Sequence, residues 1–222
     1  PNFILLDSSD CTSILNAIYK NYEIEGDLKK TFTSMISKTK NKIPFDFFNE
    51  EQKRDFVKIF HDYQNEMKKR NALDFDDLIA IPIQIMNKMP SVHETEAKYN
   101  RWILIDEYQD INNVQFEFMK LIGKYATMTA VGDPDQSIYG WRGSNMGIIM
   151  RFSEEYENAN VIILDTNYRS TRSILSASNS VIQNNKNRYE KTLKACSDAH
   201  DGSLIENVLC YDQNDEVIHI IQ

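Results

Sequence analysis

The sequence predicts an α/β protein in which parallel strands follow a mostly helical first part. Apolar residues recur at helical spacing through residues 1–90. From Trp102 onward, short apolar runs alternate with helical segments instead. Strands that alternate with helices are typical of α/β layers with a parallel sheet. In such sheets ligands bind beyond the carboxyl ends of the strands, so the residues that follow each strand are the first candidates for a site.

The first part is expected to contain several helices. A capping sequence at residues 7–10 and the interruption at Gly26-Asp27 divide the apolar pattern. Pro82 should kink its helix or sit in the first turn. The expected elements are an apolar run at 3–6, a helix from the cap to Gly26, a helix from near Leu28 toward Pro44, and helices at 50–70 and 74–89.

The second part is expected to hold the sheet. The run Trp102–Ile105 predicts a buried parallel strand closed by two carboxylates. The expected strands are 102–105, 128–131, 161–164 and 205–211, and the expected helices are 112–124, 145–152 and 171–185.

Composition limits the class of protein further. The chain has 222 residues with 41% apolar content and many Phe, Tyr and Ile residues, which argues against wholesale disorder. The formal charge of −8 argues against a generally basic nucleic-acid coat, although it leaves room for a local groove. Three distant cysteines form no CxxC pair, so a reducing compartment is the simpler interpretation. The apolar runs are too short for a membrane span, and an intracellular location is expected.

The string ILIDEYQD at residues 103–110 is the first candidate site. A hydrophobic strand that delivers Asp-Glu to a sheet edge has the layout of a Mg²⁺-nucleotide site. In that interpretation Asp106 holds the Mg²⁺, and Glu107 orients or deprotonates the attacking water. The alternative is a strand end whose carboxylates only cap the next helix.

The string VGDPDQSIYGWRGS at residues 131–144 follows the next strand. The amide of Gln136 is suited to bond a γ-phosphate or water. The rings of Tyr139 and Trp141 alternate with small residues and are suited to base stacking. Arg142 is suited to a phosphate contact, or to bracing the loop against a carboxylate. For Trp141 alone, core packing is the alternative.

The string LDTNYRS at residues 164–170 follows a third expected strand. Tyr168 is suited to stack on an adenine, and Arg169 to reach a γ-phosphate as an arginine finger. The alternative is an ordinary surface Tyr-Arg pair.

In this order and at these separations, the three strings resemble motifs II, III and IV of superfamily 1A DNA helicases, the UvrD/PcrA/Rep-like group. LDFDDLI at residues 73–79 resembles the short motif that precedes motif II in that group, and FILLDSSD at residues 3–10 resembles the segment after motif Ib. The resemblance covers essentially the whole chain. It implies a partial RecA-like P-loop NTPase fold with an inserted helical subdomain. The implied domains are a 1B-like insertion with its flanks at 1–90, the second part of domain 1A at 91–160 and the start of domain 2A at 161–222.

The resemblance implies ATP and Mg²⁺ as cofactors. Asp106 would be the Mg²⁺-associated carboxylate and Glu107 the catalytic base. Gln136 would sense the γ-phosphate. Tyr168 would stack on adenine, and Arg169 would be the arginine finger.

The resemblance also implies DNA as the partner, as single strands and at junctions of single-stranded with duplex DNA. Tyr139 and Trp141 would contact the single strand, and Arg142 would support the link between DNA and ATP. The family moves 3′ to 5′ and separates duplexes, which suggests a role in DNA repair or recombination.

One hallmark of the family is missing from the sequence. A GxxxxGK[ST] phosphate loop does not occur, since the only Gly-Lys pair is Gly123-Lys124 followed by Tyr125. Pro1 is not an initiator methionine. The expectation is therefore an internal segment of a longer helicase, itself a poor ATPase. The alternatives are a non-catalytic DNA-binding relative and the helicase part of a helicase–nuclease.

Two basic clusters are candidate phosphate contacts. The first contains Lys29, Lys30, Lys38, Lys40 and Lys42, and the second contains Lys186, Arg188, Lys191 and Lys194. Either cluster could lie along a DNA backbone, and the alternative for each is a solvated helix face.

Overall fold

The computed structural model describes residues 2–47, 49–186 and 188–221, apart from the side chain of Arg142. The chain divides into two compact units, Pro1–Arg151 and Phe152–Gln222. Each unit is described by itself. Both contain helices and short parallel strand pairs, so the α/β class predicted from the sequence is confirmed.

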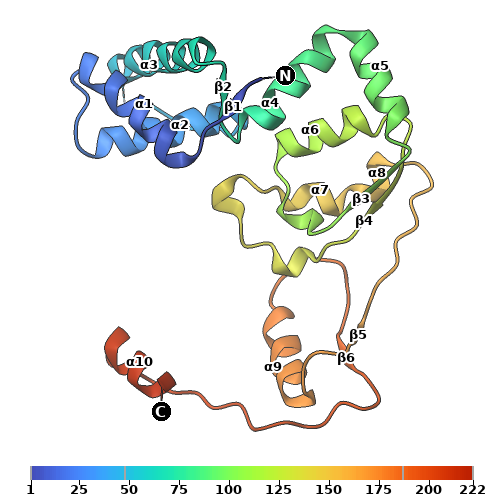
Figure 1. The fold of residues 1–222 in the computed structure, drawn as a ribbon. Helices are drawn as coiled ribbons and strands as arrows, with labels where there is room; N and C mark the ends of the chain where they lie inside the picture. The colour runs from blue at the N-terminus through green and yellow to red at the C-terminus, as the bar shows by residue number, and fades with distance from the viewer. Residues whose placement is uncertain (1, 48, 187, 222) are drawn as a thin grey trace. The chain divides into compact units, whose positions relative to one another are not determined.

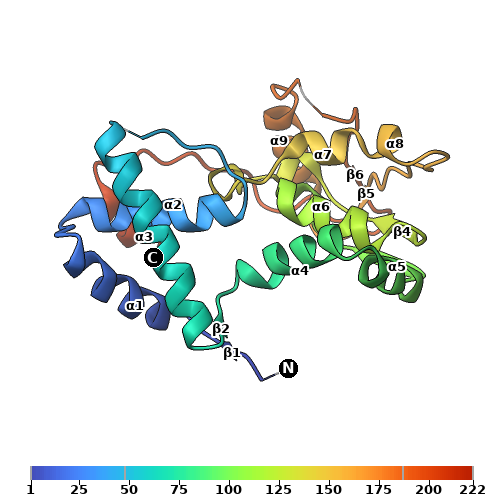
Figure 2. The ribbon, with the colours of Figure 1, turned by 90° about the horizontal axis from the view of Figure 1, so that it is seen from above.

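The first unit begins with the predicted helices, drawn in blue to blue-green in Figures 1 and 2. Asp7 caps the first of them, because its carboxylate accepts the backbone N–H groups of Ser9 and Asp10, and the Asp10 side chain accepts the N–H of Asp7 in return. The helices are α1 (Ser8–Asn21), α2 (Asp27–Lys40) and α3 (Glu50–Lys69).

These three helices enclose the main hydrophobic core. Phe32 and Ile59 are fully buried, and the ring of Phe56 packs against those of Phe32, Phe45 and Phe47. The apolar residues recur every three or four positions along each helix, which is why one face of each helix meets the others.

A short parallel pair closes this helical part. Strand β1 (Ile4–Leu5) lies beside β2 (Ala72–Leu73), so the beginning of the chain pairs with residues that follow α3. Helices α4 (Asp77–Lys88) and α5 (Pro90–Tyr99) come next. Pro82 lies inside α4, beyond its first turn, so the first-turn alternative of the two expected for it is excluded. Neither β2 nor α5 was predicted.

The predicted central strands are present as a parallel pair. Strand β3 (Trp102–Ile105) pairs with β4 (Thr127–Ala130), and α6 (Asn113–Ile122) connects them. The prediction of buried strands was wrong for one face of this pair, since Trp102 is 72% and Leu104 is 78% exposed. Residues on the other face, such as Ile103 and Met128, are half-buried because the end of α6 packs there. Gly123, which follows the last residue of α6, approaches them so closely that a Cβ on it would lie within 3.3 Å of both side chains.

Short helical turns follow both strands and complete the first unit. They are η1 (Tyr108–Asp110), η2 (Pro134–Gln136), η3 (Gly140–Arg142) and α7 (Met146–Met150). The single helix expected at 145–152 is therefore interrupted, and α8 (Phe152–Glu155) belongs to the second unit.

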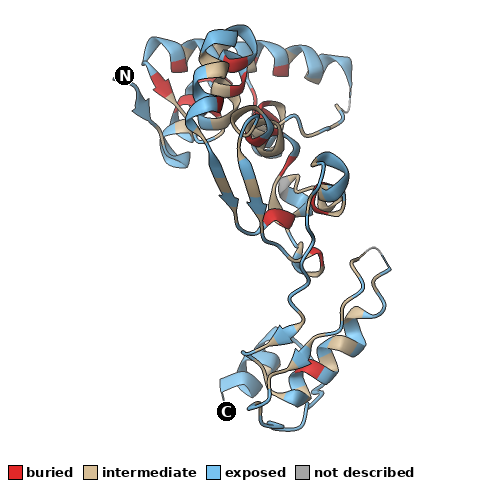
Figure 3. Ribbon diagram, turned by 90° about the vertical axis from the view of Figure 1, so that its right-hand side faces the viewer, coloured by how far each residue is buried: buried red, intermediate tan, exposed pale blue. Residues whose placement is uncertain are grey.

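The second unit has helices α9 (Arg172–Ile182) and α10 (Gln213–Ile221) and one parallel pair, β5 (Thr166–Asn167) with β6 (Lys194–Ala195). The expected strands at 161–164 and 205–211 were wrong. Both runs are apolar but largely exposed, and no described residue pairs with them as a strand. Leu175 on α9 is the one buried residue among those described in this unit (Figure 3).

Within the described part of the chain, every helix is too short or too polar to cross a membrane.

Candidate functional site

The candidate site of the first unit lies where β3 and β4 end. Asp106 and Glu107 follow β3 directly and are both exposed. One carboxylate oxygen of Asp106, Oδ1, accepts the backbone N–H of Glu107 at 2.9 Å. A single exposed carboxylate at a strand end is what Mg²⁺ takes from a protein when phosphates and water supply its other ligands. Asp106 therefore fits the predicted Mg²⁺ role.

Glu107 has an unusual backbone conformation. Its φ of 50° and ψ of 43° lie in the left-handed region, which is costly for any residue with a Cβ. This turn directs the chain into η1, where the N–H of Tyr108 donates to the carbonyl of Val131 at 2.9 Å. The segment after β3 is thereby fixed to the segment after β4.

Gln109 is a residue that the sequence analysis missed. It is 1% exposed, and its side chain contacts both segments. Its Nε2 donates to Glu107 Oε2 at 2.7 Å, and its Oε1 accepts the backbone N–H of Asp133 at 2.9 Å. The only signal in the sequence was an amide within a string of carboxylates, and its burial is not visible from that pattern.

Gln136 lies at the end of η2. Its Nε2 donates to Asp133 Oδ2 at 2.9 Å, while Asp133 Oδ1 accepts the N–H of Asp135 and caps the turn. Gln136 is exposed and its amide is held in a defined place. The structure thus brings Asp106, Glu107 and Gln136 to the same edge of the β3–β4 pair.

The loop after η2 carries the predicted DNA contacts. Trp141 is 72% exposed, which excludes core packing within the first unit, and Tyr139 is half-buried. Their ring centroids are 6.4 Å apart with the planes inclined at 59°. Exposed and neighbouring aromatic rings are suited to stack on bases. The side chain of Arg142 lies outside the described residues.

Gly143 ends this loop with a φ of 84°, a conformation that favours glycine. A Cβ on Gly143 would also lie 2.5 Å from Ile43 Cδ1, so the side chain of Ile43, which follows α2, rests directly on this loop.

Tyr168 and Arg169 belong to the second unit, where they follow β5. The Asn167 side chain accepts the backbone N–H groups of Arg169 and Ser170 at 2.9 and 2.8 Å, which shapes the turn. Tyr168 is 81% exposed, and Arg169 is exposed too. Both side chains are accessible to a ligand, and their meeting with the residues of the first unit stays a prediction.

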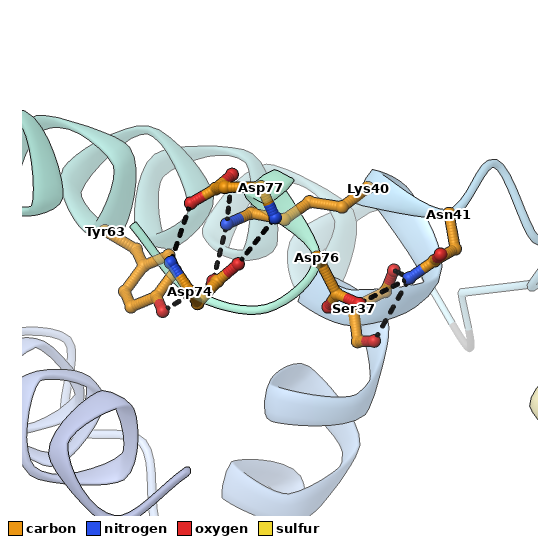
Figure 4. A network of polar contacts seen from close by, with 7 residues as sticks. All are labelled: Ser37, Lys40, Asn41, Tyr63, Asp74, Asp76 and Asp77. Atoms are coloured by element: carbon orange, nitrogen blue, oxygen red, sulfur yellow. Dashed lines mark hydrogen bonds and ion pairs between the residues drawn. The ribbon is translucent and has the colours of Figure 1, made fainter. Parts of the chain in front are cut away.

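A buried ion-pair cluster surrounds Lys40, as Figure 4 shows. The side chain of Lys40 is only 4% exposed, and its Nζ lies 2.6 Å from Asp74 Oδ2 and 2.8 Å from Asp77 Oδ1. The hydroxyl of Tyr63 donates to the same oxygen of Asp74 at 2.9 Å. We call Lys40, Tyr63, Asp74 and Asp77 the Lys40 cluster. The suggestion that Lys40 contacts DNA phosphate was wrong, because two carboxylates already enclose its charge.

The ionisation of the Lys40 cluster follows from its surroundings. Burial alone would raise the pKa of Asp74, but the hydrogen bond and the charge of Lys40 outweigh it and lower that pKa below its usual value. Burial raises the pKa of Tyr63 strongly, and the negative charge of Asp74 adds to this. Burial raises the pKa of Asp77 above its usual value, because the hydrogen bond and charge of Lys40 offset it only in part there. The cluster therefore sets the ionised carboxylate of Asp74 and the neutral phenol of Tyr63 around Lys40.

Other members of the two basic clusters also have acidic partners. Lys42 Nζ lies 2.5 Å from Glu117 Oε2, Lys30 lies 3.4 Å from Asp27, and Lys194 lies 2.5 Å from Asp165. These pairs are solvent-exposed at the lysine, so they remain open to exchange with phosphate. Whether either cluster binds DNA stays a prediction.

Comparisons with known proteins show which families this chain is similar to. The family model described as the UvrD/REP helicase N-terminal domain matches residues 1–157, and that of the UvrD-like helicase C-terminal domain matches residues 162–222. An ATP-dependent DNA helicase PcrA of Staphylococcus aureus is 37% identical over 200 residues, covering 86% of this chain and 27% of the relative. A PcrA of Staphylococcus epidermidis is 33% identical over 229 aligned positions, covering 100% of this chain and 31% of the relative. The chain thus spans less than a third of the length of these relatives.

Proposed function

The chain belongs to the UvrD/Rep helicase family, and on that premise we propose that it forms part of an ATP-dependent motor that moves 3′ to 5′ on single-stranded DNA and unwinds duplexes. A role in DNA repair or recombination accompanies this proposal. The observation that carries it is the placement of Glu107 and Gln136 at the ends of two adjacent parallel strands, joined through Gln109 and Asp133.

The proposal includes a division of the chain into parts. Residues 1–90 form the helical insertion with its flanks, residues 91–160 the second part of a RecA-like domain, and residues 161–222 the start of another. Two parallel pairs that end in polar loops, β3–β4 and β5–β6, support this division.

The residues act on ATP as follows. Asp106 would hold Mg²⁺, which when bound would neutralise charge on the phosphates. Glu107 accepts a proton from the attacking water, and the Gln136 amide hydrogen-bonds the γ-phosphate or that water. Tyr168 stacks on the adenine, and Arg169 stabilises the charge on the γ-phosphate during transfer.

The aromatic loop is the DNA side of the motor. Trp141 stacks on a base and Tyr139 contacts the strand beside it, with Arg142 supporting the connection to the ATP site. Base stacking on an aromatic side chain contributes about 1–3 kcal/mol and does not depend strongly on the base, which suits a motor that moves along any sequence.

The decisive variant is Glu107→Gln in the whole protein that carries this chain. Loss of a general base lowers turnover by about 100- to 10,000-fold, so DNA-stimulated release of phosphate should nearly disappear. Binding of a fluorescent ATP analogue should persist, because the amide keeps the shape of the side chain. Glu96→Gln, an exposed change on α5, is the matched control and should keep wild-type turnover.

The outcomes separate the candidate functions. Preserved turnover in Glu107→Gln would remove Glu107 from its role. A wild-type protein that binds single-stranded DNA without hydrolysing ATP would favour the non-catalytic relative.

A further inference from the structure

We propose that Gln109 is a positioning residue that couples the catalytic base Glu107 to the γ-phosphate sensor Gln136. This inference rests on the proposed function, since it assigns a role within the same site. It starts from an uncommon observation: a side-chain amide that is 1% exposed joins the loops of two strands through separate donor and acceptor atoms.

The donor end of the amide fixes Glu107. Gln109 Nε2 donates to Glu107 Oε2 at 2.7 Å and lies 3.3 Å from Asp110 Oδ2. Glu107 is otherwise an exposed side chain on a turn, free to adopt several rotamers. A hydrogen bond to a charged acceptor is stronger than one between neutral groups, so this contact selects one orientation of the carboxylate.

The acceptor end of the amide fixes the loop after β4. Gln109 Oε1 accepts the N–H of Asp133 at 2.9 Å. In addition, the backbone carbonyl oxygen of Gln109 accepts the hydroxyl of Ser137 at 3.4 Å. A Cβ on Gly132 would lie 2.6 Å from Gln109 Oε1 and 3.0 Å from the N atom of Tyr108. Gly132 is therefore required for the close approach of this loop to the amide.

The connection continues to Gln136 in one further step. Asp133 receives the Gln109 contact through its backbone and the Gln136 contact through its side chain, at 2.9 Å in both cases. Glu107, Gln109, Asp133 and Gln136 thus form a continuous path, which we call the Gln109 bridge. A shift of Gln136 toward or away from the γ-phosphate would move Asp133 and, through Gln109, the orientation of the base.

The chemistry requires an amide at position 109. The side chain must donate to a carboxylate and accept from a backbone N–H at the same time, and an amide of this length does both through two separate atoms. A glutamate has the same shape but would place a third carboxylate beside Glu107 and Asp110. A methionine fills a similar volume but forms neither hydrogen bond.

The test compares Gln109→Glu and Gln109→Met in the whole protein, using phosphate release with and without oligo-dT as a function of ATP concentration. We expect Gln109→Met to lower kcat by about 10- to 100-fold with a KM for ATP within about threefold of wild type, because the base is present but misoriented. Gln109→Glu keeps the shape of the side chain but loses the donor to Glu107, so its kcat should fall by a similar factor, with a KM for ATP that is likewise close to wild type.

The matched controls are Gln115→Met and Gln115→Glu on α6. Gln115 Oε1 accepts the N–H of Asn112 in a helix cap, which Gln115→Met removes and Gln115→Glu keeps, and neither change touches the Gln109 bridge. Both controls should keep the wild-type kcat, so that a fall in kcat at constant KM is specific to position 109.

Two negative results have different meanings. An active wild-type enzyme whose Gln109 variants keep the wild-type kcat would overturn this inference alone. A wild-type protein without DNA-stimulated hydrolysis would overturn the proposed function and the inference with it.

Discussion

The Lys40 cluster and the Gln109 bridge both bury polar side chains between segments distant in sequence, but they do so with different chemistry. Lys40 joins the end of α2 to the start of α4 with a full charge held by two carboxylates. Gln109 joins the loops after β3 and β4 with a neutral amide.

The difference lies in what each arrangement allows to move. Separating buried opposite charges leaves them without solvent or partner, so the Lys40 cluster resists opening. A hydrogen bond from a side-chain amide to an exposed carboxylate can be exchanged for one to water at much smaller cost in free energy. The Lys40 cluster is therefore suited to hold the helical part of the first unit in place, and the Gln109 bridge to respond to a ligand.

The largest expected effect is on stability and comes from Lys40→Met. This change leaves Asp74 and Asp77 buried and uncompensated, and we expect the free energy of unfolding to fall by about 3–5 kcal/mol. Urea unfolding followed by circular dichroism measures this. Lys42→Met is the control, because that lysine is 60% exposed and pairs with Glu117 at the surface, where a pair contributes about 0–1 kcal/mol. Equal losses in the two variants would contradict the distinction.

An intermediate effect is expected from Gly132→Ala. The new methyl group must displace Gln109 Oε1 or the Tyr108 backbone, and overpacking of this kind costs about 1–3 kcal/mol. Gly140→Ala is the matched control, since a Cβ there meets nothing within 4 Å, and its change should stay within about 0.5 kcal/mol. If thermal unfolding gives the same midpoint for both variants, the loops do not close on Gln109 as described.

The smallest effect on the free energy of unfolding is expected at Glu94, which forms exposed ion pairs. It gives the size of a surface contribution with which the two buried arrangements can be compared. Hydrogen bonds from Lys98, Lys124 and Tyr125 lower the pKa of Glu94 to about 2. Because the folded pKa is depressed, the contribution of Glu94 is present above its unfolded pKa of about 4.3 and is lost as the pH falls toward 2.

Glu94→Gln should therefore have a lower free energy of unfolding than wild type at pH 7. This difference should shrink as the pH falls from 5 to 2. The measurement is the free energy of unfolding of both proteins across that range. With Lys98 and Lys124 both changed to Met, the pH-dependent part of the difference should become smaller. A difference that grows on acidification would reverse the assigned sign.

Local patterns predicted α1, α2 and α3 well, whereas α5 and α10 were not predicted. The cap at Asp7 and the spacing of apolar residues in the first three helices depend on neighbours within a few positions, and such neighbours are visible in a sequence. The runs at 161–164 and 205–211 have strand composition, but a strand also requires a partner, which composition does not supply.

The candidate site was predictable in part for a similar reason. Asp106, Glu107 and Gln136 follow strands, so topology alone places them together. The burial of Lys40 depends on Asp74 and Asp77, which lie 34 and 37 positions further along the chain, and counting charges in a window could not find them. The role of Gly132 is likewise a matter of contact with a distant side chain rather than of loop flexibility.

At Glu107 the left-handed backbone places the stability of the fold and the proposed activity in conflict. At a φ of 50° glycine is the residue that the backbone accommodates with least strain, so Glu107→Gly would relax the turn while removing the proposed base. A directed-evolution campaign that selected only for heat resistance would thus be drawn toward an inactive protein at this position. Selection for turnover has to be applied at the same time to keep the carboxylate.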